Sequence, residues 1–270
     1  MRLLWMFLLP AFALASGSNS LSRQEKAAGW ILLFDGKSLA AWHDPAQWSP
    51  RGDSWTIEDG CIKARPNPRV GEDLLSKATF RDFEMAFEWK ISPGGNSGVK
   101  YRIQDRVRIT ESTRARNRSW EQWYSDEVRL RRVDRARLAP GDRLWEQVVG
   151  YEYQMIDAAH EDARRGGSHV TGALYDLDAP VNPNILPAGQ FNSSRIVVRG
   201  DHTEHWLNGV KVLDADLNTP KHKEAFARRW GADSGMYKLY ADPTRKDCPI
   251  GLQNHGDAVW FRKLRIRRLR

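Results

Sequence analysis

The strongest constraint on the fold is a series of short segments in which apolar and polar residues alternate. The stretch 82–91, DFEMAFEWKI, carries five apolar residues at every second position, with charged residues between most of them. Successive side chains of a β-strand point to opposite faces, so this pattern predicts a strand with one buried face. Comparable segments, each bounded by Gly, Pro, Asn or Asp, occur at 31–34, 54–57, 61–64, 98–103, 150–157, 195–200, 205–213, 249–256 and 258–269.

The spacing of the turns predicts how these strands are connected. Asp59-Gly60 and Asn208-Gly209 are strong hairpin signals, and other turn signals recur every 8–12 residues. This rhythm favours a sandwich or a barrel over alternating βαβ units. One apolar face per strand fits two packed sheets. We therefore predict an all-β sandwich of two antiparallel sheets, with one short helix at 223–231.

The N-terminus predicts export. Residues 1–15, MRLLWMFLLPAFALA, combine an early Arg, an apolar run and the small-x-small sequence Ala13-Leu14-Ala15. This is the pattern of a secretory signal peptide, and the run is shorter than the roughly 20 residues that span a membrane. We predict cleavage near Ala15 and a periplasmic or extracellular protein, with an uncleaved anchor as the alternative. Residues 16–28 are expected to form a flexible lead-in to a single domain at 29–270.

The composition indicates a globular protein that does not insert stably into a membrane. Its formal net charge is +8 and 12 of its 270 residues are Trp. A basic chain can bind nucleic acid, but an exported one rarely meets any, so we expect no nucleic-acid partner. Two cysteines, Cys61 and Cys248, remain. Export permits a disulfide between them, and two buried free thiols are an equally good interpretation.

Two segments interrupt the strand pattern. Residues 106–148 hold eleven Arg and have weak periodicity, so we interpret them as an insertion that carries a hairpin or helix at the rim of the sandwich. Residues 157–184 are rich in Asp, His, Gly and Pro and follow a predicted strand directly. Long loops on a rigid β scaffold often line binding sites, although a plain surface loop would look the same.

Several strands carry unusual polar residues opposite their apolar face. A solvated face would favour Lys, Glu, Ser and Thr, whereas these strands offer amides, a guanidinium and an imidazole as well. Such groups hold a defined ligand, and we predict that they line a shared polar site. The residues are Asn96, Lys100, Arg102, Glu152, Gln154, Gln253 and His255.

A family resemblance rests on several of these segments together. They are LLFDGKSLAAW (32–42), SWTIEDGCI (54–62), FEMAFEWKISPGGNSGVKYR (83–102), YEYQMID (151–157), TGALYDL (171–177), RIVVRG (195–200), HWLNG (205–209) and GLQNHGDAVWFRKLRIRRL (251–269). In this order the chain resembles the 3-keto-disaccharide hydrolase domain family. The resemblance implies a concanavalin-A-like jelly roll with a site on its concave sheet, export in many members, and action on glycosides whose ring carries a ketone at C3. Residues 106–148 exceed the usual family length.

The chemistry of such a substrate assigns roles to the polar residues. A C3 ketone acidifies the C2 proton, and its removal gives an enolate that expels the C1 oxygen by β-elimination before water adds back. A general base and a general acid each contribute about 10²–10⁴-fold, and a donor at the oxyanion about 10²–10³-fold. We expect Glu152 and His255 to act as base and acid, in either order, and Arg102 to stabilise the enolate. The expected substrate-binding residues are Asn96, Lys100, Gln154 and Gln253.

Other functions remain open at this stage. Asp157, His160 and Asp162 are weak candidates for a divalent metal site, although the sequence requires no cofactor. Glu84 and Glu88 share one strand face and could serve a conventional two-carboxylate glycosidase. A non-catalytic carbohydrate-binding module is a third possibility. The sequence has no dinucleotide fingerprint, so a separate dehydrogenase is expected to oxidise the substrate at C3.

Overall fold

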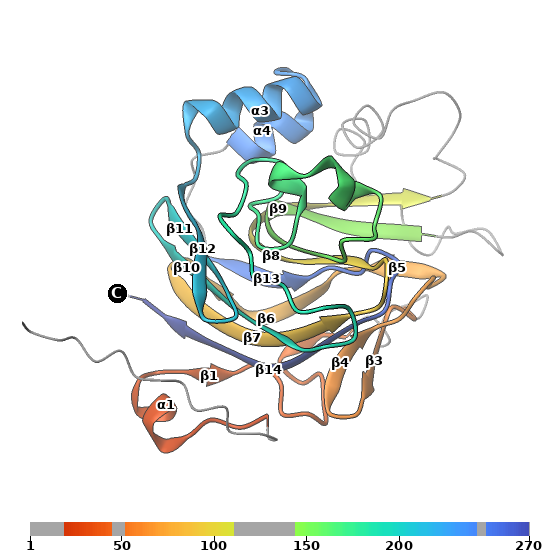
Figure 1. Ribbon diagram of the computed structural model, residues 1–270, viewed down its shortest axis with the longest axis vertical. Helices are drawn as coiled ribbons and strands as arrows, with labels where there is room; N and C mark the ends of the chain where they lie inside the picture. Colours follow the sequence, from red (N-terminus) through yellow and green to blue (C-terminus); the bar gives the residue numbers. More distant parts are fainter. Residues whose placement is uncertain (1–18, 45–51, 111–143, 242–246, 270) are drawn as a thin grey trace, which may run out of the picture.

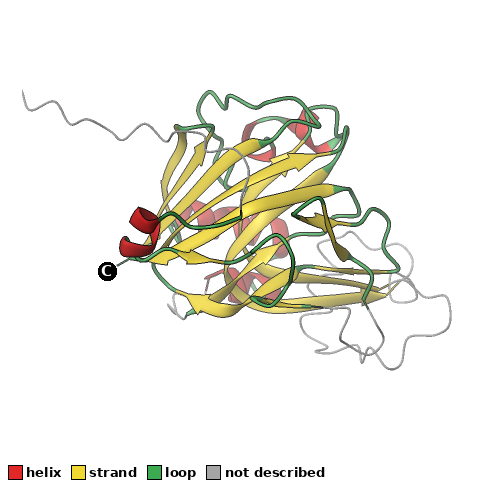
Figure 2. Ribbon diagram, turned by 90° about the horizontal axis from the view of Figure 1, so that it is seen from below, coloured by secondary structure: helices red, strands yellow, loops and turns green. Residues whose placement is uncertain are grey.

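The computed structural model describes residues 19–44, 52–110, 144–241 and 247–269. The expected signal peptide at 1–15 lies outside these ranges, as does the central part, 111–143, of the expected insertion. Strands are the main type of regular secondary structure in the described chain (Figure 2).

The strands form two sheets, and every strand pair is antiparallel except β5–β9, which is parallel. Sheet A has the order β12 (Val210–Asp216), β11 (His202–Leu207), β10 (Asn192–Arg199), β7 (Phe83–Ile91), β14 (Val259–Arg268), β4 (Cys61–Ala64) and β3 (Trp55–Glu58), with β1 (Ile31–Leu32) on β14. Sheet B has the order β2 (Trp42–His43), β6 (Leu74–Phe80), β13 (Cys248–Leu252), β8 (Asn96–Thr110), β9 (Leu144–Ile156) and β5 (Val70–Glu72).

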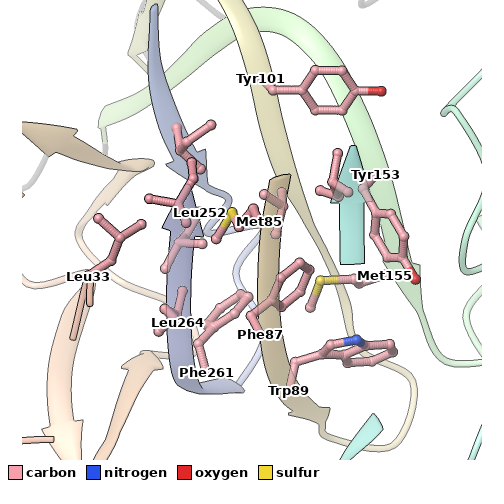
Figure 3. Close-up of a cluster of buried hydrophobic side chains, with 14 of the residues drawn as sticks. Leu33, Met85, Phe87, Trp89, Tyr101, Tyr153, Met155, Leu252, Phe261 and Leu264 are labelled. Carbon is pink, nitrogen blue, oxygen red and sulfur yellow. The ribbon is translucent and has the colours of Figure 1, made fainter. Parts of the chain in front are cut away.

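The hydrophobic core lies between the two sheets. Phe87 and Trp89 of sheet A meet Tyr153 and Met155 of sheet B there (Figure 3). The rings of Phe87 and Tyr153 pack edge to face, with centroids 6.0 Å apart. All four side chains occupy the alternating positions that the sequence assigned to a buried face. The two sheets and the core between them confirm the predicted jelly-roll sandwich of two mainly antiparallel sheets.

The structure corrects the expected N-terminal lead-in. Helix α1 (Arg23–Ala27) begins with a capping box, in which Ser22 and Glu25 each accept a hydrogen bond from the other's backbone N–H. The Asn19 side chain donates to the Gly60 carbonyl and accepts from the Lys263 N–H. The described part of this segment is therefore folded against sheet A, and the prediction of flexibility for 16–28 is wrong there.

The helical part also exceeds the prediction. Helix α3 (Pro220–Trp230) begins three residues earlier than expected, because Thr219 caps it and Pro220 occupies its first turn. A second helix, α4 (Gly235–Ala241), follows it. The loop at 157–184 contains two short 3₁₀ helices, η3 (Asp162–Arg165) and η4 (Gly167–His169). Sequence analysis also missed the strands β2, β5 and β6.

Helices α3 and α4 and the loop that follows β9 lie at one end of the molecule, whereas α1 lies at the other (Figure 1). The loop runs beside β9, because the Gln154 N–H donates to Ala173 and the Tyr175 N–H donates to Glu152. Helix α4 contacts β8 and β9. Loop and helices are thus placed next to the strands that carry most of the predicted site residues.

The two cysteines are separate. Cys61 lies in β4 of sheet A and Cys248 in β13 of sheet B, and both are buried free thiols. Of the two interpretations left open by the sequence, the disulfide is wrong.

Candidate active site

The register of sheet B aligns the predicted site residues on the face turned away from the core, here called the polar face. Lys100 of β8 lies directly opposite Glu152 of β9, and Gly98 lies opposite Gln154. Residues that face each other across antiparallel strands point to the same side of the sheet. Tyr153, between Glu152 and Gln154, points into the core instead. The alternation of β9 therefore brings a carboxylate and an amide to one face, beside a lysine.

A second carboxylate, which sequence analysis did not identify, completes a buried charge cluster. Asp73 lies just before β6, and its Oδ2 is 3.3 Å from the Lys100 Nζ. The same oxygen accepts from the Val148 N–H, and Oδ1 accepts from the Asn254 N–H. The Lys100 Nζ is 4.0 Å from Glu152 Oε2. One lysine thus serves two carboxylates, of which only Asp73 also receives two backbone hydrogen bonds.

Glycine at position 98 leaves room for the Glu152 side chain. A Cβ at this position would lie 2.4 Å from Glu152 Oε1 and 2.7 Å from its Cγ. Real Cβ atoms do not come this close to other heavy atoms, so the Glu152 carboxylate lies in the space that a larger residue would fill. The Gly98 of the GGNSG segment therefore has a role in the site, beyond turn formation.

The environment of Glu152 raises its pKa towards neutral pH. Burial raises its pKa, Lys100 opposes this, and Asp73 adds to it, so that the pKa reaches about 7. Burial also lowers the pKa of Lys100, but Asp73 and Glu152 outweigh it, and the net pKa is raised. Lys100 is therefore charged throughout the physiological range, while Glu152 exchanges its proton there.

The segment after β13 brings His255 to the edge of the polar face. Asn254 anchors it, because its Nδ2 donates to the Ser54 carbonyl at 2.9 Å and its Oδ1 accepts from Gly256. The His255 ring is 6.4 Å from the ring of His160. Desolvation lowers the pKa of His255, the charge of Asp257 opposes this, and the charge of Lys100 adds to it, with a net lowering. His255 is therefore neutral near pH 7.

Two amide oxygens on this face are buried without a partner. Within the described part of the chain, Asn96 Oδ1 and Gln253 Oε1 accept no hydrogen bond. The Gln253 Nε2 lies 3.5 Å from Glu152 Oε2, at the long end of the hydrogen-bond range. A buried unsatisfied acceptor costs free energy that a ligand hydroxyl would recover. Gln154 is also buried, and its Oε1 accepts weakly from the Met155 N–H at 3.3 Å.

Arg102 does not join this face. A β-bulge between Tyr101 and Asp105 interrupts β8, and Arg102 adopts a positive φ of 51°. Its Nη1 instead pairs with Asp201 Oδ1 at 3.3 Å, in the turn between β10 and β11. The prediction that Arg102 shares the face of Lys100 is wrong, because simple alternation fails at the bulge, and this placement does not support a contact between Arg102 and an enolate on that face.

Ile103 takes the place that alternation gave to Arg102. It leaves the main core and packs with Leu75 and Val148 in a separate cluster. Its Cδ1 lies 3.2 Å from the position of a Cβ at Gly251, and Gly251 is paired with Lys100. Ile103 therefore points to the polar face. The sequence carried one signal for this change, the glycine at 150 within a strand, where a Cβ would lie 2.7 Å from the Tyr101 carbonyl oxygen.

The three weak metal candidates have other partners. Asp157 Oδ1 accepts from the Gly94 N–H, His160 Nδ1 accepts from the Asp162 N–H, and Asp162 accepts from Tyr175 and Arg165. Among the described residues, a group with ligand atoms within 4.8 Å of one another forms elsewhere, from His202, Glu204 and Asp214. The Nζ of Lys211 already pairs with Asp214 there.

Glu84 and Glu88 form ion pairs between neighbouring strands of sheet A. Glu84 pairs with Arg195 and Arg267, and Glu88 pairs with Arg262 and Lys263, all within sheet A. Four residues along a strand correspond to about 13 Å, beyond the roughly 5–9.5 Å that separates the two carboxylates of a glycosidase. This pair therefore does not support a conventional glycosidase.

Helices α3 and α4 add residues that sequence analysis did not assign to the site. Arg229 is the penultimate residue of α3, and its charge lowers the pKa of Glu152. Tyr240 lies in α4, and Glu152 contributes to its raised pKa. Tyr240 stacks between Phe226 and Trp230, with centroid distances of 4.4 and 6.5 Å. The helical spacing of 223–231 was visible in the sequence, but nothing in it indicated which strands the helix would approach.

Comparison with known proteins identifies the family. Residues 29–267 match the family described as the 3-keto-alpha-glucoside-1,2-lyase-like domain. The chain belongs to this family. A relative from Bacteroides thetaiotaomicron named 3-keto-disaccharide hydrolase is 30% identical over 267 residues, which cover 94% of this chain and 83% of the relative.

Solved structures support the fold. A putative glycosyl hydrolase from Parabacteroides distasonis is 24% identical, with a TM-score of 0.65, and the alignment covers 94% of this chain and all of that chain. A second putative glycosyl hydrolase from the same organism is 21% identical, with a TM-score of 0.55. The alignment covers 89% of this chain and 99% of that hydrolase. Within the described residues of this chain, no helix is long and apolar enough to cross a membrane.

Proposed function

We propose that this protein cleaves 3-keto-glycosides, including 3-keto-disaccharides, by C2 proton abstraction, β-elimination and addition of water. The observation that carries the proposal is Glu152, a carboxyl group with a pKa of about 7 beside the charged Lys100. A general base is most effective when its pKa lies near the working pH. The membership of the chain in the family, and the name of its relative, support the substrate class.

Glu152 is the base of the first step. Its carboxylate takes the C2 proton, the C–H electron pair forms the C2=C3 double bond, and the carbonyl electrons move to O3. Glu152 then holds the proton, and the negative charge has moved to the substrate. Asn96 and Gln253 bind substrate hydroxyls through their unpartnered oxygens, and Gln154 lies on the same face. Lys100 forms an ion pair with Asp73 and lowers the pKa of Glu152, in opposition to burial.

His255 is the general acid that protonates the leaving-group oxygen. As the C3 carbonyl re-forms, the C1–O bond breaks and leaves a C1=C2 double bond. The neutral imidazole donates the proton of one ring nitrogen to the leaving oxygen, while its other nitrogen accepts a proton from water. The hydroxide adds at C1, and Glu152, which has exchanged its proton with solvent in the meantime, delivers a solvent-derived proton to C2. Exposure of His255 gives it the contact with solvent that this relay requires.

The proposal extends to the setting of the reaction. A ketone at C3 must be supplied by a dehydrogenase that oxidises the glycoside, because cleavage itself is redox-neutral. The N-terminal sequence 1–15 supports export, so the substrate would meet this enzyme outside the cytoplasm.

A paired substrate assay in D₂O tests the function. We expect turnover of a 3-keto-glucoside, no turnover of the unoxidised glucoside, and one deuterium at C2 of the released 3-keto sugar. Cleavage of the unoxidised glucoside alone would instead support a conventional glycosidase. Glycan binding without turnover, unchanged in Glu152→Gln, would support a binding module. Repeating the assay with a chelator, and then with added divalent metal, shows whether turnover needs an ion.

A further inference from the structure

Arg229 lies near Glu152 and has no role in the proposed reaction so far. It is the penultimate residue of helix α3, and its Nη1 pairs with Asp176 Oδ2 at 2.8 Å. The guanidinium lies over two aromatic rings, 4.7 Å from the centroid of Trp230 and 5.6 Å from that of Tyr175. The Arg229 side chain is about 30% exposed, so it is held in place and still accessible to a small ligand.

The partner of Arg229 is itself held in a specific position. Asp176 adopts a positive φ of 64°, a conformation that residues other than glycine rarely take. Its N–H donates to the Ser168 carbonyl, and its Oδ1 is 3.3 Å from His169 Nε2. The loop after β9 therefore fixes the Asp176 carboxylate between an imidazole and the guanidinium. Such strain persists only where the surrounding structure determines it, and it is frequent at functional sites.

The charge of Arg229 acts on the catalytic carboxylate. It lowers the pKa of Glu152, in opposition to burial, which raises it most. The charged groups that act on Glu152 are Lys100 from β8, Asp73 from between β5 and β6, Arg229 from α3 and Asp162 from η3. Tyr175, under the guanidinium, donates its N–H to the Glu152 carbonyl at 3.0 Å. Arg229 and Lys100 therefore approach Glu152 from different structural elements.

We propose that Arg229 is the catalytic cation that binds the enolate oxygen O3, with Asp176 as its positioning residue. This inference rests on the proposed function. When Glu152 takes the C2 proton, its own charge disappears and an equal charge appears on O3. Lys100 remains paired with the fully buried Asp73, whereas Arg229 lies on the accessible side. Its several N–H donors keep their charge throughout the reaction. Arg229 thus takes the role that the sequence had suggested for Arg102.

The test compares Arg229→Met with Arg228→Met, whose side chain on the same helix is 72% exposed. We expect kcat on a 3-keto-glucoside to fall about 10²–10³-fold in Arg229→Met, with KM changed less than about threefold. The acidic limb of the kcat/KM profile should move to higher pH, because the loss of a nearby positive charge raises the pKa of Glu152. Arg228→Met should match wild type in both. Asp176→Asn should lower kcat less than Arg229→Met.

A second measurement does not depend on turnover. The pKa of the Glu152 carboxyl, followed by ¹³C NMR in wild type and Arg229→Met, should rise in the variant. Arg229→Lys provides the same comparison if the methionine variant does not fold, since it keeps the charge but loses the forked donors, and its kcat should fall while the Glu152 pKa moves little. An unchanged Glu152 pKa in Arg229→Met, or kcat within about threefold of wild type, would overturn the inference. If wild type cleaves no 3-keto-glucoside, the proposed function fails, and the NMR titration alone decides whether Arg229 acts on Glu152.

Discussion

Two glutamates, one on each sheet, have similar exposure and opposite protonation behaviour. The Glu88 side chain on β7 is 14% exposed and that of Glu152 on β9 is 12% exposed. Glu88 receives hydrogen bonds from Arg262 Nε at 2.7 Å and Lys263 Nζ at 2.8 Å, and its pKa is lowered although burial opposes this. The pKa of Glu152 is raised to about 7.

Burial raises the pKa of both carboxyl groups, and the number of close donors decides how far that effect is offset. Glu88 has two cations in direct contact, whereas Glu152 has one at 4.0 Å, shared with Asp73. A carboxylate that shares its only close cation with another carboxylate keeps most of its desolvation penalty. The arrangement around Glu88 therefore stabilises the fold, and the arrangement around Glu152 produces a group that can exchange a proton at neutral pH.

Removing the charge of Glu152 and that of Glu88, in separate variants, tests this contrast most directly. We expect Glu152→Gln to lower kcat on a 3-keto-glucoside about 10³-fold, because the amide cannot take the C2 proton. Glu88→Gln should leave kcat within about twofold of wild type, since Glu88 belongs to sheet A and is bound by Arg262 and Lys263. Steady-state kinetics on both purified variants decide this. Equal losses in the two variants would contradict the distinction.

Displacing the Glu152 carboxylate should have a smaller effect. Gly98→Ala places a Cβ only 2.4 Å from the present position of Glu152 Oε1, so the Glu152 side chain must move. We expect kcat to fall about 10–100-fold with a change in Tm of only a few degrees, because the flexible end of Glu152 can yield. The double variant with Glu152→Gln serves as the control. It should be no slower than Glu152→Gln alone, since residues acting through one group are not additive.

The two glutamates should also affect stability with opposite signs. The folded pKa of Glu152 is about 7, above the reference value of 4.5, so its ionisation destabilises the fold progressively as pH rises between these values. Glu152→Gln should therefore be more stable than wild type at pH 8, by on the order of 1–3 kcal/mol, with the difference vanishing near pH 4.

Glu88→Gln should behave in the opposite way. The lowered pKa of Glu88 contributes stability above its unfolded pKa, and this contribution is lost as pH falls through the folded value. The variant should therefore be less stable than wild type at pH 7 and approach it in acid. Urea unfolding of the three proteins between pH 4 and 8 measures both effects. Parallel curves for the two variants would contradict the electrostatic account.

Replacing Arg102 should have only a small effect on activity. Arg102→Gln should keep kcat within about threefold of wild type, because the guanidinium pairs with Asp201 away from the polar face. The loss of this partly exposed pair should cost about 0–1 kcal/mol of stability. Steady-state kinetics of Arg102→Gln, measured in parallel with Arg229→Met, check the expected kcat. A thermal melt of Arg102→Gln checks the expected stability. A large loss of kcat in Arg102→Gln would restore the role that alternation had assigned to it.

Local patterns were sufficient for much of the fold. The alternation in 82–91 identified the buried residues of β7, and Asn208-Gly209 located the hairpin between β11 and β12. These features depend on neighbours in the chain. Residues 70–80 were missed because β5 is short and is buried throughout, and because β6 starts with a run of buried residues, so neither alternates clearly. Asp73, which lies between them, was missed for the same reason.

The sequence alone determined that strands 98–103 and 150–157 would place Lys100, Glu152 and Gln154 opposite an apolar face, because a period of two follows from the geometry of an extended chain. Tertiary structure alone decided which charges meet. The bulge at Arg102 depends on the pairing of β8 with β9, and Asp73 and Arg229 reach Glu152 from elements far away in the chain. A pKa depends on distances and burial in three dimensions, and neither is encoded in the order of residues along a strand.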